Sequence, residues 1–179
     1  MYNDLEKILI TREELALRVK ELAKTLDEDY KGKNPIVVCI LKGSTLFFAD
    51  LVREMKIPVE FDFLSISSYG NKTKSSGEVK MIKDLDNLIE NRHVLLIEDI
   101  VDSGYTLTYL KKLLSSRRPA SIKICTLLDK KSRREVPLEP DYCGFEIDDY
   151  FVVGYGLDYA QKYRNLPEIG VLKPEVYTK

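Results

Sequence analysis

The sequence predicts an α/β fold in which helices cover a core of parallel strands. Two uninterrupted apolar runs, Ile36 to Leu41 and Val94 to Ile97, are typical of strands that are buried on both faces of a sheet. Each run leads through a short turn into apolar residues at helical spacing, which start at Leu46 and at Leu107. Strands that alternate with helices favour a parallel sheet with right-handed crossovers. The 179 residues suit a single domain with a sizeable core.

The composition is ordinary for a soluble globular protein, with 44% hydrophobic and 32% charged residues. A net charge of −1 gives no overall attraction to nucleic acid or to an anionic membrane, so neither is expected as a partner. No apolar run approaches the roughly 20 residues of a membrane span, and the first residues are not typical of a signal peptide. Three widely spaced cysteines, Cys39, Cys125 and Cys143, indicate buried free thiols and a cytoplasmic location.

The chain before the first apolar run is predicted to be helical from Leu5 to Tyr30. Thr11 and Glu14 fit the S/T-x-x-E pattern of a capping box, and apolar residues then recur on one face. The Gly- and Pro-containing segment from Lys31 to Pro35 ends this helix.

Four more strands follow from the pattern of apolar residues. The alternation from Val59 to Ile66 predicts a strand with one exposed face. Val79 to Lys83 and Ser121 to Leu128 are also predicted strands, and Tyr150 to Gly154 is predicted to be the last strand. The polar stretch from Ser68 to Glu78 cannot contribute to a core, which predicts a mobile loop, either an idle connection or a lid.

The run from Val94 to Ile97 ends on two acids, Glu98 and Asp99, and a third acid, Asp102, follows. In open α/β sheets, ligands bind beyond the carboxyl ends of the strands. The carboxylates suit the two hydroxyls of a ribose, directly or through Mg²⁺, and Asp102 would face the anomeric carbon. A turn into a helix offers backbone N–H groups to a phosphate. The residues of that turn are Ser103, Gly104, Tyr105 and Thr106. The alternative is an acidic strand end that is only solvated, which three acids beside such a turn disfavour.

Two other nucleotide-binding patterns are absent from the sequence. No segment matches GxxxxGK[ST], and the Gly154-Tyr155-Gly156 segment lacks the third glycine of GxGxxG. The segment from Val94 to Thr106 instead resembles, at essentially every position, the phosphoribosyl-diphosphate (PRPP) binding motif of type I phosphoribosyltransferases. Over nearly the whole chain this resemblance narrows to the bacterial hypoxanthine-guanine members of that family.

The resemblance implies the type I phosphoribosyltransferase fold, with a parallel-sheet core, a small hood subdomain and a flexible lid. The single domain of residues 1–179 would divide into a core of about residues 10–140 and a hood made by the N-terminal residues and about 141–179. Lys42 and Gly43 would form the diphosphate loop, in which the peptide bond before the glycine is cis, and Arg164 would contact the same diphosphate. Ser68 and Tyr69 would begin the lid.

The same resemblance implies how a purine would be bound. Lys130 would meet the 6-oxo group, Phe151 would stack on the ring, and the backbone of Val152 would read its edge. Asp158, also beside the purine, would hold a second Mg²⁺ through water, while Glu98 and Asp99 would serve the first.

Each of these residues has a simpler interpretation. Lys130 belongs to a basic run that ends at Arg134, and such runs are usually solvated, while aromatic residues such as Phe151 usually pack in a core. Asp158 or Arg164 alone would mean little. Most of these residues, however, fall at or just beyond the ends of apolar strands, where the acidic turn is also expected, and this favours a common site.

The expected reaction is purine salvage. The 5-phosphoribosyl group of PRPP would pass to N9 of hypoxanthine or guanine, giving IMP or GMP and diphosphate, with Mg²⁺ as cofactor and Asp102 accepting the N7 proton. A homo-oligomer, dimer or tetramer, is implied by the resemblance. One alternative is a regulator of the same fold that binds RNA through Arg117, Arg118 and the run from Lys130 to Arg134. Others are a xanthine or a uracil phosphoribosyltransferase.

Overall fold

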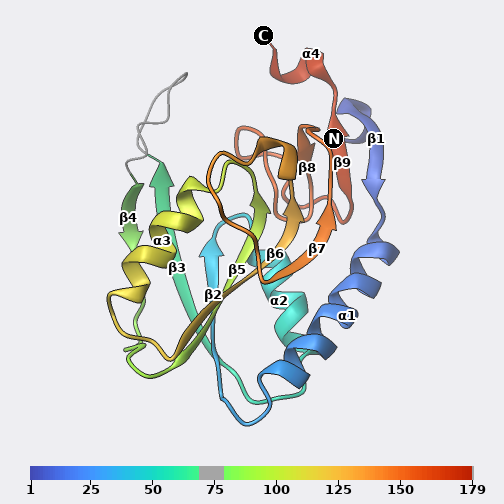
Figure 1. Cartoon of the computed structure of the whole chain (residues 1–179). Helices are drawn as coiled ribbons and strands as arrows, with labels where there is room; N and C mark the ends of the chain where they lie inside the picture. Colours follow the sequence, from blue (N-terminus) through green and yellow to red (C-terminus); the bar gives the residue numbers. More distant parts are fainter. Residues whose placement is uncertain (69–78, 179) are drawn as a thin grey trace.

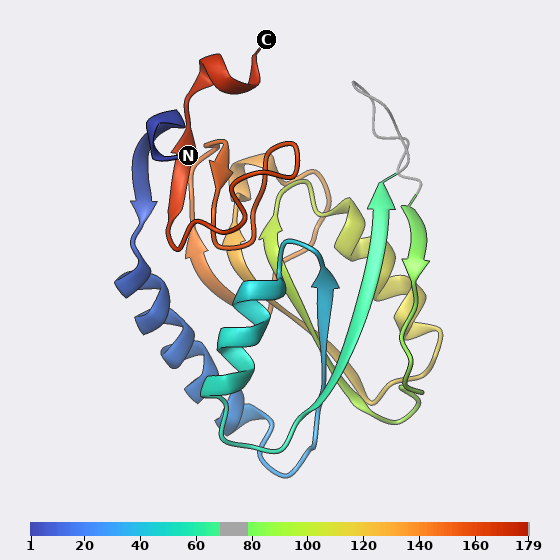
Figure 2. The ribbon, with the colours of Figure 1, turned by 180° about the vertical axis from the view of Figure 1, so that it is seen from behind.

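The main sheet of the protein is mostly parallel and carries helices on both faces (Figures 1 and 2). The structure, a computed structural model, describes residues 1–68 and 79–178. Within them this sheet has six strands in the order β4-β3-β2-β5-β6-β7, of which only β4 is antiparallel to its neighbour. The strands in that order are β4 (Val79–Lys83), β3 (Glu60–Ser68), β2 (Ile36–Leu41), β5 (His93–Val101), β6 (Ser121–Asp129) and β7 (Tyr142–Glu146).

A small antiparallel sheet lies above the carboxyl ends of the parallel strands, on the side where both chain ends lie (Figure 1). Its strands, in spatial order, are β1 (Leu5–Ile10), β9 (Ile169–Leu172) and β8 (Val152–Val153). Leu5, Val153 and Leu172 pack with Tyr163 and Leu166 in a core of its own.

Helices α1 (Arg12–Asp29) and α2 (Thr45–Glu54) cover one face of the main sheet, and α3 (Tyr105–Ser115) covers the other (Figures 1 and 2). Successive residues of a strand point to opposite faces, so each buried strand contributes to both cores. Val37 and Cys39 of β2 pack on the α1 and α2 side, whereas Ile36 and Val38 pack on the α3 side. The short elements are η1 (Tyr2–Asp4), η2 (Lys131–Arg133) and α4 (Pro174–Tyr177).

The predicted capping box is present, but the predicted start of the first helix is wrong. Thr11 Oγ1 accepts the Glu14 N–H at 3.2 Å, and the Glu14 carboxylate accepts the Thr11 N–H at 2.8 Å. Residues Leu5–Ile10 form β1 rather than helix because they pair with β9, far along the chain.

Two strand predictions need correction as well. The Tyr150 to Gly154 segment contains only the two residues of β8, and the last strand is β9, which the sequence did not predict. β7 was not predicted either. In β3 the predicted alternation is present, and the buried face includes Asp62, whereas Phe61 on the other face is 50% exposed.

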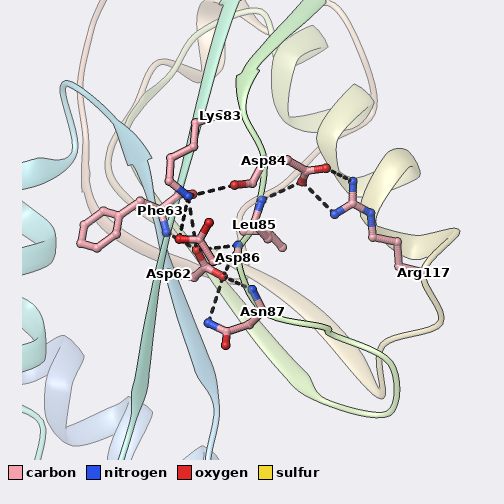
Figure 3. Close-up of polar contacts among 8 residues, drawn as sticks. All are labelled: Asp62, Phe63, Lys83, Asp84, Leu85, Asp86, Asn87 and Arg117. Atoms are coloured by element: carbon pink, nitrogen blue, oxygen red, sulfur yellow. Dashed lines mark hydrogen bonds and ion pairs between the residues drawn. The ribbon is translucent and has the colours of Figure 1, made fainter.

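Asp62 is buried because its carboxylate ties β3 to the segment that follows β4 (Figure 3). It accepts backbone N–H groups of Phe63 at 2.7 Å, Asp86 at 3.0 Å and Asn87 at 2.9 Å, and the Asn87 side-chain amide at 3.1 Å. The ammonium nitrogen of Lys83 lies 3.8 Å from Asp62 Oδ1. Burial raises the pKa of Asp62, but these donors outweigh burial and the pKa is lowered overall.

A second contact holds the same segment on the α3 side of the sheet. Arg117 donates two hydrogen bonds to the Asp84 carboxylate, at 2.8 and 2.6 Å (Figure 3). We call Asp62, Lys83, Asp84, Asp86, Asn87 and Arg117 the β3 clamp. The loop predicted as a lid lies between β3 and β4, and residues 69–78 of it lie outside the described residues.

Cys39 and Cys125 are buried free thiols, as predicted, and Cys143 is half-buried and free. None of the helices in the described part of the chain combines the length and the apolar content that a membrane crossing requires.

Candidate active site

A cavity of about 260 Å³ lies between the carboxyl ends of β5 and β6 and the small sheet. Six of the predicted site residues line it together with Ile100 and Leu157. The six are Asp99, Asp102, Lys130, Phe151, Val152 and Asp158. Residues from three separate parts of the chain therefore meet at the carboxyl ends of the parallel strands, where the sequence predicts a common site.

Glu98 and Asp99 are adjacent near the end of β5, and both are poorly solvated. Glu98 is buried, and one of its carboxylate oxygens accepts the Asp99 N–H at 3.1 Å. Asp99 Oδ1 accepts the N–H of Ile100 at 2.7 Å. Burial raises the pKa of both carboxyls, and the neighbouring Asp99 charge raises that of Glu98 further. The ionised form of the pair is therefore disfavoured, and a cation or a hydrogen-bond donor would stabilise it.

Gly43 lies directly against Asp99, with no space for a side chain. A Cβ at Gly43 would stand 1.6 Å from Asp99 Oδ2, and a Cβ at Gly156 would stand 2.0 Å from the Gly43 carbonyl oxygen. Gly156 also has a φ of +104°, which other residues rarely adopt. The cis peptide bond lies between Leu41 and Lys42, one position earlier than the bond directly before Gly43.

Arg164 joins this group from the loop after β8. Its guanidinium donates to the Gly156 carbonyl at 2.7 Å and lies 2.9 Å from Asp158 Oδ1. The positive charge of Arg164 also acts on Asp99, where it opposes the effect of burial on the pKa. The predicted diphosphate residues Gly43 and Arg164 thus meet through Gly156, while the side chain of Lys42 is exposed.

The turn from Asp102 to Thr106 connects β5 to α3, as predicted. Gly104 has a φ of +88° and precedes the first helical residue, Tyr105, without a side-chain cap. The segment after β6 covers this turn: Glu135 N–H donates to the Ser103 carbonyl at 3.0 Å, and a Cβ at Gly104 would approach Val136 to 2.9 Å. Backbone N–H groups of the first α3 turn can donate hydrogen bonds to an anion such as a phosphate.

The basic run after β6 is not uniformly solvated. Lys130 is only 8% exposed and lines the cavity, which disfavours the solvated interpretation for this residue. Lys131 pairs with Glu146 at the surface, and Arg134 pairs with the buried carboxylate of Asp129.

Phe151 is 37% exposed, so it is not an ordinary core residue. Its ring stacks on Tyr177 with a centroid separation of 4.5 Å and meets Tyr159 edge-on at 5.7 Å. Val152 follows in β8 and pairs with Val171, so its backbone is held by the small sheet. Of the predicted lid residues, Ser68 ends β3, and Tyr69 lies outside the described residues.

Sequence reasoning missed two charged residues beside the cavity. Arg133 Nε lies 3.2 Å from Asp102 Oδ1, and its Nη1 lies 3.5 Å from Asp149 Oδ2. The Asp102 carboxylate raises the pKa of Arg133. The position of Asp149 two residues before Phe151 was a usable signal, but nothing in the sequence distinguishes Arg133 from its basic neighbours.

The carboxylates at the cavity suit a Mg²⁺ ion that takes some of its ligands from the protein and the others from a substrate. Among residues 1–68 and 79–178, no three or more His, Cys, Asp or Glu side chains gather closely enough to hold a metal by themselves. Asp99 and Asp158 nevertheless line the same cavity. Mg²⁺ commonly binds one or two carboxylates and completes its coordination with water and substrate phosphates.

Comparison with known proteins adds independent evidence. The family described as "Phosphoribosyl transferase domain" matches residues 7–160. The hypoxanthine-guanine phosphoribosyltransferase of Bacillus subtilis is 55% identical over 177 residues, which cover 99% of this chain and 98% of the relative. A crystal structure of a hypoxanthine phosphoribosyltransferase from Staphylococcus aureus is 50% identical with a TM-score of 0.97, and the match covers 100% of this chain and 97% of that one. The chain is also 54% identical to the bifunctional protein TilS/HprT of Listeria innocua, of which it spans 28%.

Proposed function

Because the chain belongs to the phosphoribosyl transferase family, we propose that it transfers the 5-phosphoribosyl group of PRPP to N9 of hypoxanthine or guanine. The products are IMP or GMP and diphosphate, so the enzyme serves purine salvage. The observation that carries the proposal is the cavity in which Asp99 and Asp102 lie with Lys130 and Phe151. The full-length relatives with this activity in their names support it.

PRPP binds along the acidic strand end and the turn after it. The backbone of Ser103, Gly104, Tyr105 and Thr106 holds the 5′-phosphate, where the α3 dipole favours an anion. Glu98 and Asp99 accept the ribose hydroxyls. Lys42, the Gly43 backbone and Arg164 bind the diphosphate. The contacts of Gly43 with Asp99 and Gly156 support this assignment, because they hold the loop against the acids.

Two Mg²⁺ ions, one at Glu98 and Asp99 and a second held through water by Asp158, would neutralise the diphosphate and make it a better leaving group. Three acids close to a polyanionic substrate would otherwise repel it. The raised pKa values of Glu98 and Asp99 support a site that takes a cation together with the substrate.

The purine lies against Phe151 with its edge toward the backbone of Val152, and Asp158 lies beside it. The Lys130 ammonium donates to the 6-oxo oxygen. N9 attacks C1 of the ribose as the bond to diphosphate breaks, and Asp102 takes the proton from N7. A positioned base of this kind contributes about 10²–10⁴-fold.

The proposal also includes a hood subdomain, a lid, an oligomeric state and a cellular location. The small sheet and its separate core support a hood distinct from the main sheet, although β7, within residues 141–179, pairs with β6. A lid from Ser68 to Glu78 would exclude water from the reactive sugar. A homo-oligomer and a cytoplasmic location complete the proposal.

The proposal is tested by assaying PRPP and Mg²⁺ with hypoxanthine, guanine, xanthine, adenine and uracil. Turnover of hypoxanthine or guanine at least about a hundredfold above adenine and uracil is expected. Faster turnover of xanthine or uracil would assign the site to another phosphoribosyltransferase. An RNA-binding regulator has less support, because Arg117, Arg118 and Lys131 each pair with an acid. Salt-dependent RNA binding without turnover would revive it.

A further inference from the structure

Four charged side chains of alternating sign form a line beside the cavity. Asp102 pairs with Arg133 at 3.2 Å, Arg133 with Asp149 at 3.5 Å, and Asp149 with Lys130 at 3.5 Å. The two ends of the line, Asp102 and Lys130, line the cavity, whereas Arg133 and Asp149 do not line it and are about half exposed. The two residues that would meet the purine are therefore connected through two that would not.

Lys130 needs a counter-charge because its ammonium is almost buried, with a side chain that is 10% exposed. Among the described residues, its ion-pair partner is Asp149 Oδ1. A lysine ammonium has three donors, so one contact to Asp149 leaves donors for the cavity. Asp149 therefore sets where the ammonium sits without using its whole capacity.

Arg133 holds both carboxylates with one planar group. Its Nε meets Asp102 Oδ1 and its Nη1 meets Asp149 Oδ2, so the guanidinium fixes the separation of the two acids. Arg134 donates to the Asp102 backbone carbonyl at 2.6 Å and so holds the main chain of the same residue. Ion pairs on a half-exposed arginine contribute little to stability, so their effect is on orientation.

We propose that Asp149 and Arg133 are positioning residues that set Lys130 and Asp102 relative to each other. The inference rests on the proposed function, which gives Lys130 the 6-oxo group and Asp102 the N7 proton. O6 and N7 are neighbours on the same edge of a 6-oxopurine, so a donor and an acceptor must be held at one fixed spacing to meet both. Small misplacement of reacting groups lowers rates strongly. One network that holds both groups provides that spacing.

The test is steady-state kinetics of Asp149→Asn and Arg133→Gln with hypoxanthine and PRPP. Asp149→Asn is expected to raise KM for hypoxanthine about tenfold while KM for PRPP stays within twofold, since only the purine contact is loosened. Arg133→Gln is expected to lower kcat about fivefold, because Asp102 loses its orientation. In the double variant, the loss in kcat/KM should be smaller than the product of the single losses, because both changes disrupt one network.

Glu146→Gln is the matched control, because it breaks a surface ion pair with Lys131 outside the cavity. It should leave both constants within twofold of the parent, and thermal unfolding should show that every variant is folded. Single variants as active as the control, or losses that multiply fully, would overturn the inference. If Lys130→Gln and Asp102→Asn are impaired while Asp149→Asn and Arg133→Gln are not, the proposed function stands and only the positioning role fails. If the parent protein forms no IMP from hypoxanthine and PRPP, both the proposed function and the positioning role are contradicted.

Discussion

Two sets of acids in the main sheet, Asp62 in β3 and the Glu98–Asp99 pair in β5, differ in the number of hydrogen-bond donors around them. Asp62 in β3 is surrounded by N–H donors, and its pKa is lowered in spite of burial. Glu98 and Asp99, on β5, have few donors and each other as neighbours, and their pKa values are raised. Asp62 has a structural role, and the protein itself supplies the hydrogen-bond donors that its carboxylate needs. Glu98 and Asp99 have no comparable set of donors, which favours the proposed role of the pair in binding a cation together with the substrate.

The largest expected effect is at the third acid of the cavity. Asp102→Asn keeps the size of the side chain but cannot accept a proton at neutral pH, so kcat should fall about 10²–10⁴-fold with little change in nucleotide affinity. Steady-state kinetics and calorimetry with IMP measure the two quantities. Asp148→Asn, an exposed neighbour of the site, is the control. A kcat within threefold of the parent would mean that another group is the base.

The next effect concerns the choice of base at Lys130. An ammonium suits O6 of hypoxanthine but opposes the 6-amino group of adenine, so the parent should prefer hypoxanthine at least about a hundredfold in kcat/KM. Lys130→Gln can turn its amide oxygen toward an amino group, and the preference should narrow. An undiminished preference in the variant would place base selection elsewhere. Lys131→Gln, on the exposed side of the same run, should behave as the parent.

Removal of Mg²⁺ tests whether the under-solvated acids need a cation. PRPP should bind at least about tenfold more weakly in EDTA, because its phosphates would approach Glu98, Asp99 and Asp158 without a neutralising charge. Isothermal calorimetry with and without Mg²⁺ measures the difference. Equal affinities under both conditions would contradict the assignment of these acids to a metal.

Asp62→Asn should lower stability rather than activity. Loss of the charge weakens four hydrogen bonds at a buried site, at a cost of about 1–3 kcal/mol. Because the pKa of folded Asp62 lies below 3.8, the stability it provides is complete above pH 3.8 and is lost as the pH falls through the folded pKa. Urea unfolding at pH 7 and at acid pH should show the gap between parent and variant closing on acidification. Asp148→Asn, at an exposed carboxylate outside the β3 clamp, is the control.

Glu98→Gln should have the smallest effect and the opposite sign. A raised pKa in the folded state means that the folded protein binds more protons, so this group costs stability as the pH rises above 4.5. Without Mg²⁺ or PRPP, the variant should be more stable than the parent at pH 7 and similar to it at pH 4. Glu6→Gln, at an exposed carboxylate far from β5 in the sequence, is the control. A Glu98→Gln variant that is less stable than the parent at pH 7 would contradict the view that Glu98, unlike Asp62, destabilises the folded protein when it is ionised.

Much of the fold and the site could be predicted because the signals are local. The run from Ile36 to Leu41 is apolar throughout, since both faces of β2 are covered. The acids that follow Val94 to Ile97 lie near the carboxyl end of β5, but the strand continues past them to Val101 because these residues pair with β6. Leu5–Ile10 was not recognised as a strand, because its partner β9 lies far along the chain. The alternation in β3 gave the period but not the buried face, because a clamp of N–H donors makes the interior favourable for Asp62. The separate fates of Lys130 and Arg133 depend on tertiary packing, which no local pattern encodes.

The pairing of β1 with β9 has a consequence for synthesis. Leu5 pairs with Leu172 and Ile10 with Ile169, so the first strand leaves the ribosome about 160 residues before its partner. At about 5–20 residues per second, the nascent chain carries an unpaired, partly apolar strand for roughly 10–30 s. During that interval α1 and the main sheet can fold, whereas β1 is open to chaperones and proteases. Because β9 also pairs with β8, the segment from Phe151 to Asp158 that lines the cavity can be held by the small sheet only after β9 has been synthesised.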